Sequence, residues 1–134
     1  MNETNATDQL AIMALTATFE RAFDLGDHDL HMSTWHDELK FESQFGNYDN
    51  HQDYRAWLVG FYEQMKERGG TRHLITNHEI SVQGDSAEMM CYLTILSQRE
   101  VVVFATAMFE DRLVKVDGQW KFTHRKLHVD QQFP

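Results

Sequence analysis

Residues 84–122 read GDSAEMMCYLTILSQREVVVFATAMFEDRLVKVDGQWKF and have the pattern of hairpin-connected β-strands. Gly84-Asp85 and Asp117-Gly118 mark turns, and Asp-Gly is well suited to a two-residue hairpin turn. Between them, Val101-Val102-Val103-Phe104 is β-branched and aromatic, as expected of a buried strand. The pattern predicts four strands, over residues 72–83, 86–98, 100–116 and 119–130.

The residues before these strands have helical periodicity. A first helix is expected to have Thr7 as its N-cap and Gly26 as its C-terminal stop. Asp27 is expected to cap a short second helix that extends to Trp35. A third helix is expected to end at Gly69-Gly70, and its wide apolar stripe consists of Tyr54, Trp57, Leu58, Phe61, Tyr62 and Met65.

Between the second and third helices, residues 39–43 alternate in polarity and predict a further strand, with turns at Gly46-Asn47 and Asp49-Asn50. Helices followed by a long run of strands predict an α+β fold, in which the N-terminal helices pack on one face of a curved antiparallel sheet. Because residues 1–134 contain no repeat or linker, we expect one domain with a core over about 8–130.

The net charge of −9 argues against nucleic acid and anionic membranes as partners, since both attract basic surfaces. No apolar run approaches the ~20 residues of a membrane span. The first residues, MNETN, lack the basic start and apolar run of a signal peptide. Cys91 is the single cysteine, so no disulfide can form within the chain. These features lead us to expect a cytoplasmic protein.

The chain resembles the SnoaL-like branch of the nuclear transport factor 2-like (NTF2-like) superfamily. The resemblance implies a cystatin-like, cone-shaped α+β barrel with a pocket at its open end, and a homodimer that forms through the sheet. It implies a small apolar molecule as the ligand, and no cofactor. Four segments carry the resemblance. They are residues 19–27, 71–77, 84–87 and 117–122, which read FERAFDLGD, TRHLITN, GDSA and DGQWKF.

Asp24 and His73 match the Asp and His that move a proton in catalytic members of that family. Imidazole titrates near neutral pH, and a carboxylate on its other nitrogen fixes the tautomer. The structural alternative is that Asp24 simply sits beside Arg21 and that His73 is a hydrogen-bonded strand residue. Phe19 stands where several dehydrating relatives have Tyr, which weakens the case for dehydration unless another tyrosine reaches in.

Further candidate binding residues are Asn77, Trp57 and Phe61, together with Phe19. Asn77 lies four residues after His73, so it points to the same side of the strand if no bulge intervenes, and His78 then points outward. Asn77 equally suits a buried structural role. Trp57 and Phe61 belong to the apolar stripe, where they either fill the core or line the pocket.

The remaining reactive residue types are interpreted as structural. No metal site is expected, because the eight histidines lack a recognised ligand spacing. Cys91 lies on an apolar strand face and fits a buried, inert thiol. Arg125 is expected to pair with Asp111 or Glu110 across a hairpin, the alternative being an anionic ligand.

These observations leave three functional hypotheses. The first is a cofactor-independent lyase, isomerase or cyclase acting on a small apolar carbonyl or polyketide-like compound by Asp24–His73 proton transfer. The second is a non-catalytic binding or assembly module resembling the small subunit of ring-hydroxylating dioxygenases. The third is an epoxide hydrolase, which needs an Asp-Arg-Asp set; Asp111-Arg112 supplies it poorly because adjacent strand residues face opposite ways.

Overall fold

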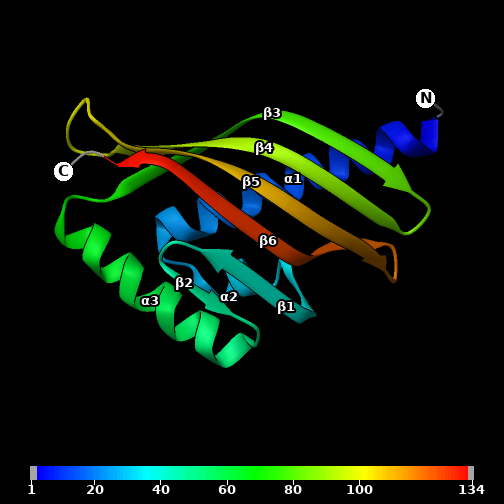
Figure 1. Ribbon diagram of the computed structural model, residues 1–134, viewed down its shortest axis with the longest axis horizontal. Coiled ribbons are helices and arrows are strands. Elements are labelled where there is room, and N and C mark those ends of the chain that lie inside the picture. Colours follow the sequence, from blue (N-terminus) through cyan, green and yellow to red (C-terminus); the bar gives the residue numbers. More distant parts are fainter. Residues whose placement is uncertain (1–2, 133–134) are drawn as a thin grey trace.

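The computed structural model of the chain describes residues 3–132, with side chains over residues 5–130. Helices come first and the long strands last, as the sequence predicts (Figure 1). The elements in order are α1 (Glu3–Leu25), α2 (His28–Met32), β1 (Trp35–Ser43), β2 (Gly46–Tyr48), α3 (His51–Glu67), β3 (Thr71–Gln83), β4 (Ser86–Ser97), β5 (Val103–Val116) and β6 (Gln119–Gln132).

The strands form one curled six-stranded sheet in the order β2-β1-β6-β5-β4-β3. Neighbouring strands run antiparallel except β1 and β6, which pair in parallel, a junction that the sequence pattern did not predict. The helices lie on one face of this sheet, and α1 runs behind β3–β6 in Figure 1. This arrangement is the mixed α+β fold that the sequence predicted.

Two predicted helix boundaries are wrong. Thr7 lies inside α1, which extends back to Glu3 in the described part of the chain. Trp35 opens β1 instead of closing α2, because the carbonyl of Thr34 already accepts a hydrogen bond of 2.9 Å from Phe122 N in β6. The predicted cap of α2 is confirmed, since the Asp27 side chain accepts a hydrogen bond of 3.1 Å from the backbone of Leu30.

Two loops also differ from the sequence prediction. The turn between β1 and β2 lies at residues 44–45, and Gly46-Asn47 belongs to β2. β5 begins at Val103, so the predicted strand is too long at its start, and Val101 is fully exposed. The Ser97 hydroxyl accepts hydrogen bonds from the backbone of residues 99 and 100, at 3.0 and 3.1 Å, and thereby turns the chain before Val101.

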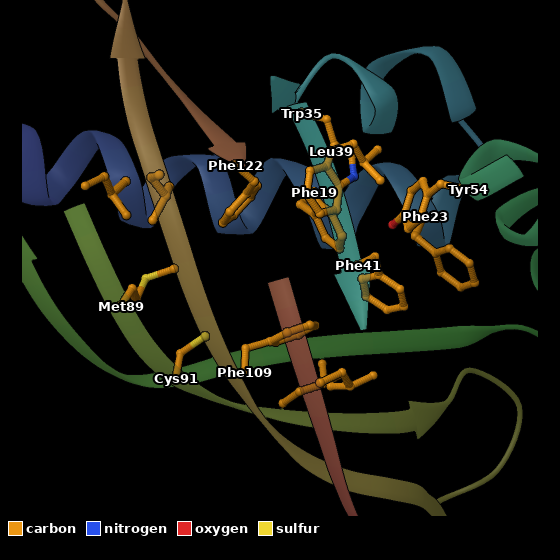
Figure 2. Close-up of a cluster of buried hydrophobic side chains, with 14 of the residues drawn as sticks. Phe19, Phe23, Trp35, Leu39, Phe41, Tyr54, Met89, Cys91, Phe109 and Phe122 are labelled. Atoms are coloured by element: carbon orange, nitrogen blue, oxygen red, sulfur yellow. The ribbon is translucent and has the colours of Figure 1, made fainter. Parts of the chain in front are cut away.

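The core fills the space between the helices and the concave side of the sheet. Figure 2 shows Phe19 and Phe23 of α1, Phe41 of β1, Tyr54 of α3 and Phe109 of β5 in this buried cluster. All five side chains are at most 4% exposed. The aromatic stripe predicted for the third helix therefore faces the core, as expected of an amphipathic helix.

A bulge in β3 reverses the side-chain alternation in the middle of that strand. The pairing register with β4 shifts between Thr76 and Glu79, and Asn77 has a left-handed backbone with φ of 56°. Asn77 is exposed, whereas His78 turns inward and lies 3.2 Å from the Thr16 hydroxyl through Nε2. The expectation that Asn77 shares a side with His73, and that His78 points outward, is therefore wrong.

Candidate active site

Asp24 and His73 meet where the end of α1 crosses the start of β3. His73 Nδ1 lies 2.6 Å from Asp24 Oδ1, and the two side chains are 6% and 7% exposed. The backbone N–H of His73 donates to Asp24 Oδ2 at 2.8 Å, and the Thr71 hydroxyl donates to Oδ1 at 2.9 Å. Three hydrogen bonds thus hold one carboxylate in a single orientation.

Local sequence explains why Asp24 reaches this position. Gly26 ends α1 with φ of 74°, a conformation that glycine adopts without strain, and its N–H donates to the carbonyl of Phe23 at 3.0 Å. Asp24 therefore lies in the last helical turn and projects toward β3. Thr71 and His73 lie two residues apart on one side of β3, so both contact the same carboxylate.

The hydrogen bond to Asp24 decides the tautomer and charge of His73. A carboxylate only accepts hydrogen bonds, so Nδ1 carries the proton and Nε2 presents its lone pair when the ring is neutral. Burial lowers the pKa of His73, but the hydrogen bond to Asp24, together with the negative charge of Asp24, outweighs burial and places the pKa above its ordinary 6.5. The ring is thus suited to hold a proton.

His73 also lines an apolar cavity, of which Asp24 is not a lining residue. Phe19, Trp57 and Phe61, which the sequence proposed as binding residues, line it together with His73, while Asn77 lies elsewhere. The cavity has a volume of about 50 Å³. Pockets that hold drug-sized ligands usually measure roughly 300–1,000 Å³. The expected ligand-sized hollow is therefore largely filled by aromatic side chains.

Phe45 lies at the edge of this cavity, in the turn between β1 and β2. It is 38% exposed, and its ring centre is 5.9 Å from that of Phe61 on α3. Phe61 in turn stacks on Trp57, with ring centres 5.5 Å apart. A ring-sized molecule reaches His73 only if these side chains move aside. The backbone of this turn is fixed by hydrogen bonds, since Phe45 N donates to the Ser43 hydroxyl at 3.0 Å and the Gln44 side chain bonds to the backbone of Val129 in β6.

His31 and Tyr54 form a second buried pair at the cavity. His31 Nδ1 lies 2.9 Å from the carbonyl oxygen of Phe19, and Nε2 lies 2.8 Å from the Tyr54 hydroxyl. Burial lowers the pKa of His31 to about 3, so the ring is neutral at physiological pH. Because the carbonyl can only accept, Nδ1 carries the ring proton, and Nε2 accepts the proton of Tyr54.

Arg125 forms the third polar group next to the cavity, and the predicted pair with Asp111 is confirmed. Its Nε and Nη2 atoms lie 2.7 and 3.0 Å from the two carboxylate oxygens of Asp111. The guanidinium carbon lies 3.7 Å from the ring centre of Phe109, and Phe19 and Phe122 also cover it. Arg125 is fully buried between Asp111 and these rings.

Sequence reasoning missed Glu20, which also lines the cavity and is 4% exposed. Its position was detectable, because Glu20 lies four residues before Asp24 and thus on the same face of the first helix. Cys91 is buried as expected, and burial raises the pKa of its thiol to about 12. Among the described residues, no three His, Cys, Asp or Glu side chains are placed to hold a metal ion.

The sequence profile of the SnoaL-like domain matches residues 4–126. The chain belongs to the SnoaL-like family. The match covers α1 through most of β6 and therefore includes both Asp24 and His73. No functionally curated protein matches this SnoaL-like chain.

Solved structures share the fold over nearly the whole chain. A cystatin-like protein of unknown function from Nostoc punctiforme is 26% identical with a TM-score of 0.83, covering 96% of both chains. A candidate scytalone dehydratase from Novosphingobium aromaticivorans is 21% identical with a TM-score of 0.86, covering 99% of this chain and 91% of its own. A candidate NTF2-like dehydratase from Streptomyces avermitilis is 15% identical with a TM-score of 0.82, covering 95% and 99%.

The described helices offer no candidate for a membrane span, since none combines the necessary length with enough apolar character.

Proposed function

We propose that this SnoaL-like protein is a cofactor-independent lyase, isomerase or cyclase that moves a proton next to the carbonyl group of a small, apolar molecule. One observation carries the proposal: Asp24 holds Nδ1 of His73, while the ring lines an apolar cavity. Among the described residues, no protein group hydrogen-bonds to the opposite nitrogen, Nε2. A buried imidazole with one nitrogen fixed and the other available is suited to general acid–base chemistry.

The reaction begins when Nε2 of neutral His73 takes a proton from the carbon next to the carbonyl. The C–H electron pair becomes a carbon–carbon double bond, and the carbonyl oxygen gains the negative charge of an enolate. Asp24 stabilises the imidazolium that forms, through its hydrogen bond of 2.6 Å to Nδ1. In an isomerisation, His73 then returns the proton to another carbon. In a cyclisation, the enolate carbon first attacks a second carbonyl carbon of the same molecule, the π pair of that carbonyl moves to its oxygen, and His73 returns the proton to this alkoxide.

Isomerisation or cyclisation fits this site better than dehydration. Phe19 has no hydroxyl group to assist a leaving oxygen. Tyr54 is the tyrosine that lines the cavity, but its proton is directed to His31 at 2.8 Å. Tyr48 packs on Trp57, and Tyr92 is 53% exposed on the outer face of the sheet. Tyr62 packs on Phe23 and His28 and lines a separate hollow beside Asp24 instead of this cavity. None of the four tyrosines therefore supplies the hydroxyl that Phe19 lacks.

The proposal predicts that the protein exchanges hydrogen atoms next to a carbonyl with solvent. Purified protein would be incubated in D₂O with a panel of small cyclic ketones, and deuterium uptake measured by mass spectrometry. We expect His73→Ala to lose the catalysed exchange, because removing a general base costs about 10²–10⁴-fold. Asp24→Asn should retain part of the exchange, since His73 remains but loses its charged partner.

The pH dependence provides a second check of the same proposal. His73 acts as a base only in its neutral form, and its pKa is raised. Exchange should therefore increase with pH through a midpoint above 6.5. His78→Ala, at the inward-facing histidine beside Thr16, is the matched control and should leave the exchange rate unchanged. Equal rates in the wild type and His73→Ala would refute the proposal.

A second candidate function is a non-catalytic binding or assembly module of the same fold, favoured by the cavity of only about 50 Å³. Such a module needs a filled, rigid core and no access to His73. In that case none of the ketones would exchange, and none would displace the aromatic residues at the cavity. The difference in tryptophan fluorescence between the wild type and Trp57→Phe during ketone titration separates the enzyme from a filled assembly module, since a ligand that moves Phe61 alters the environment of Trp57.

A further inference from the structure

Glu20 is a buried carboxyl group at the cavity that the proposed proton transfer does not use. Its Oε1 atom is buried and has no hydrogen-bond partner among the described residues. Its ion-pair partner is Arg125, whose Nη1 atom lies 3.8 Å from Glu20 Oε1 and is equally without a hydrogen bond. Burying an ionised carboxylate without hydrogen bonds is costly, so such a group usually serves a function or stays neutral.

The charges around Glu20 favour its neutral form. Groups from four elements face it: Asp24 of α1, His73 of β3, Asp111 of β5 and Arg125 of β6. Arg125 keeps its charge and binds both oxygens of Asp111, so that ion pair is neutral as a whole. The charge of Asp24 is balanced only while His73 is protonated. An ionised Glu20 would add an unbalanced negative charge in either state of His73.

The protonation states of Glu20 and His73 are coupled. Burial raises the pKa of Glu20, and the positive charge of His73 is the strongest influence that lowers it. When His73 becomes neutral, that influence disappears and Glu20 holds its proton more tightly. The state in which His73 can act as a base is thus the state in which Glu20 is an acid.

The other polar groups at the cavity do not supply a proton to a substrate oxygen. Tyr54 donates to His31, and neutral His31 donates to the carbonyl of Phe19. In its basic form, His73 presents a lone pair to the cavity. A buried carboxylic acid can donate a hydrogen bond at neutral pH. Of the side chains that line the described cavity, Glu20 remains as the donor.

We propose that Glu20 is a catalytic residue that donates its carboxyl hydrogen to the carbonyl oxygen of the substrate. This inference rests on the proposed function. While His73 Nε2 removes the proton from the neighbouring carbon, the C–H pair forms the carbon–carbon double bond and the carbonyl π pair moves to oxygen. The oxygen takes the Glu20 proton, which leaves an enol, a Glu20 carboxylate and a His73 imidazolium. The net charge of the site stays unchanged, and the reverse transfers regenerate both groups.

Infrared spectroscopy tests the protonation state without any substrate. The empty protein, labelled with ¹³C-glutamate, would be compared with Glu20→Gln at neutral pH. We expect the carbonyl band of a protonated, buried carboxylic acid in the wild type and its loss in Glu20→Gln. Identical spectra in that region, with carboxylate bands alone, would overturn the inference.

Ligand binding tests the donor role independently of turnover. The probes are cyclohexanone and methylenecyclohexane, which have similar shapes but differ in the oxygen atom. The wild type and Glu20→Gln, whose amide also donates, should prefer the ketone. Glu20→Met keeps the length of the side chain without a donor and should lose the preference. Equal affinity for both probes in the wild type, or an unchanged preference in Glu20→Met, would contradict a donor at this position.

Hydrogen exchange then separates this inference from the proposed function. Glu20→Met should exchange ketone hydrogens about 10²-fold more slowly than the wild type, because a donor to a developing oxyanion is lost. Glu20→Gln should lose less. If the wild type shows ketone preference but no exchange, the donor role stands and the proton transfer fails. If His73→Ala abolishes exchange while Glu20→Met has no effect, the proton transfer stands and Glu20 is not the donor.

Discussion

His31 shows how burial fixes the chemical state of a single residue. It lies among Phe19, Phe23 and Tyr54 and is 1% exposed. In the unfolded chain its pKa is near 6.5, whereas burial lowers the folded value to about 3. The folded protein therefore binds fewer protons than the unfolded chain between these two values. A drop in pH through this range favours unfolding.

We predict that His31 makes the protein sensitive to acid. The stabilisation that the folded protein gains by keeping His31 neutral is fully present above pH 6.5. This contribution to the free energy of unfolding is lost as the pH falls toward 3, at about 1.4 kcal/mol per pH unit. His31→Gln keeps a donor and an acceptor but does not titrate. Urea unfolding at several pH values should show that the stability difference between the two proteins changes by this slope. Parallel pH curves would contradict the prediction.

Some residues of the candidate site could be predicted from the sequence, and others could not. Family resemblance identified Asp24 and His73, and the structure brings them into contact at 2.6 Å. Thr71 and Glu20 were detectable from their spacing, two residues before His73 and four before Asp24. The pairing of His31 with Tyr54 was not detectable from the sequence. It depends on how α2 and α3 pack against each other, which local sequence patterns do not specify.

Gly26 determines where α1 ends and thereby places Asp24 in the last turn of the helix, next to His73. The φ of 74° at Gly26 ends α1 at Leu25, one residue beyond Asp24, and a Cβ atom there would lie only 2.6 Å from the Tyr62 ring. Gly60, in the interior of α3, has open space around it. The same substitution should consequently have opposite effects at the two glycines.

We predict that Gly26→Ala destabilises the protein and that Gly60→Ala stabilises it. The left-handed backbone costs an L-residue about 1–2 kcal/mol, and the contact with Tyr62 adds to the loss. In a helix interior, Ala is better than Gly by about 0.5–1 kcal/mol. Thermal and urea unfolding of the two variants would measure both changes. A loss of stability in Gly60→Ala, or none in Gly26→Ala, would show that these local features do not control the two sites.

Apart from β2, which was predicted as a turn, the elements themselves followed from periodicity, turn residues and caps. The bulge at Asn77 did not, although Asn is a residue type that tolerates the left-handed conformation. A bulge is decided by how two strands and the helix beneath them fit together, so the sequence of β3 alone leaves it open. This one residue explains the errors for both Asn77 and His78.

At the scale of the whole molecule, the outer face of the sheet carries apolar side chains that the helices do not cover. Leu74, Met90 and Tyr92 are 45%, 41% and 53% exposed. They lie on β3 and β4, and Tyr92 pairs across the ladder with Met108 of β5. The family resemblance predicts a homodimer through the sheet, and this surface is where a second copy would pack.

We predict that the protein is a dimer and that Tyr92→Glu converts it to a monomer. A charge at the centre of a symmetric contact is brought close to its own copy and is desolvated. Light scattering after gel filtration should give twice the chain mass of 15.8 kDa for the wild type and the single mass for the variant. Val101→Glu, in the loop before β5, is the control and should remain dimeric. A monomeric wild type would contradict the prediction.

The volume of the cavity lies beyond sequence prediction for a general reason. Aromatic composition predicts an apolar interior, but whether rings fill it or line it depends on their rotamers and on the distance between helices and sheet. The sequence pattern around Phe45, Trp57 and Phe61 is compatible both with rings that fill the cavity and with rings that only line it.

The left-handed residue at position 77 also divides β3 into two parts whose side-chain phase is set separately. The part before it carries His73 to the cavity, and in the part after it the carbonyl of Ile80 accepts a hydrogen bond of 3.5 Å from the Gln9 side chain of α1. The contact of His73 with Asp24 is therefore independent of the phase in which the later part of β3 packs against the helix.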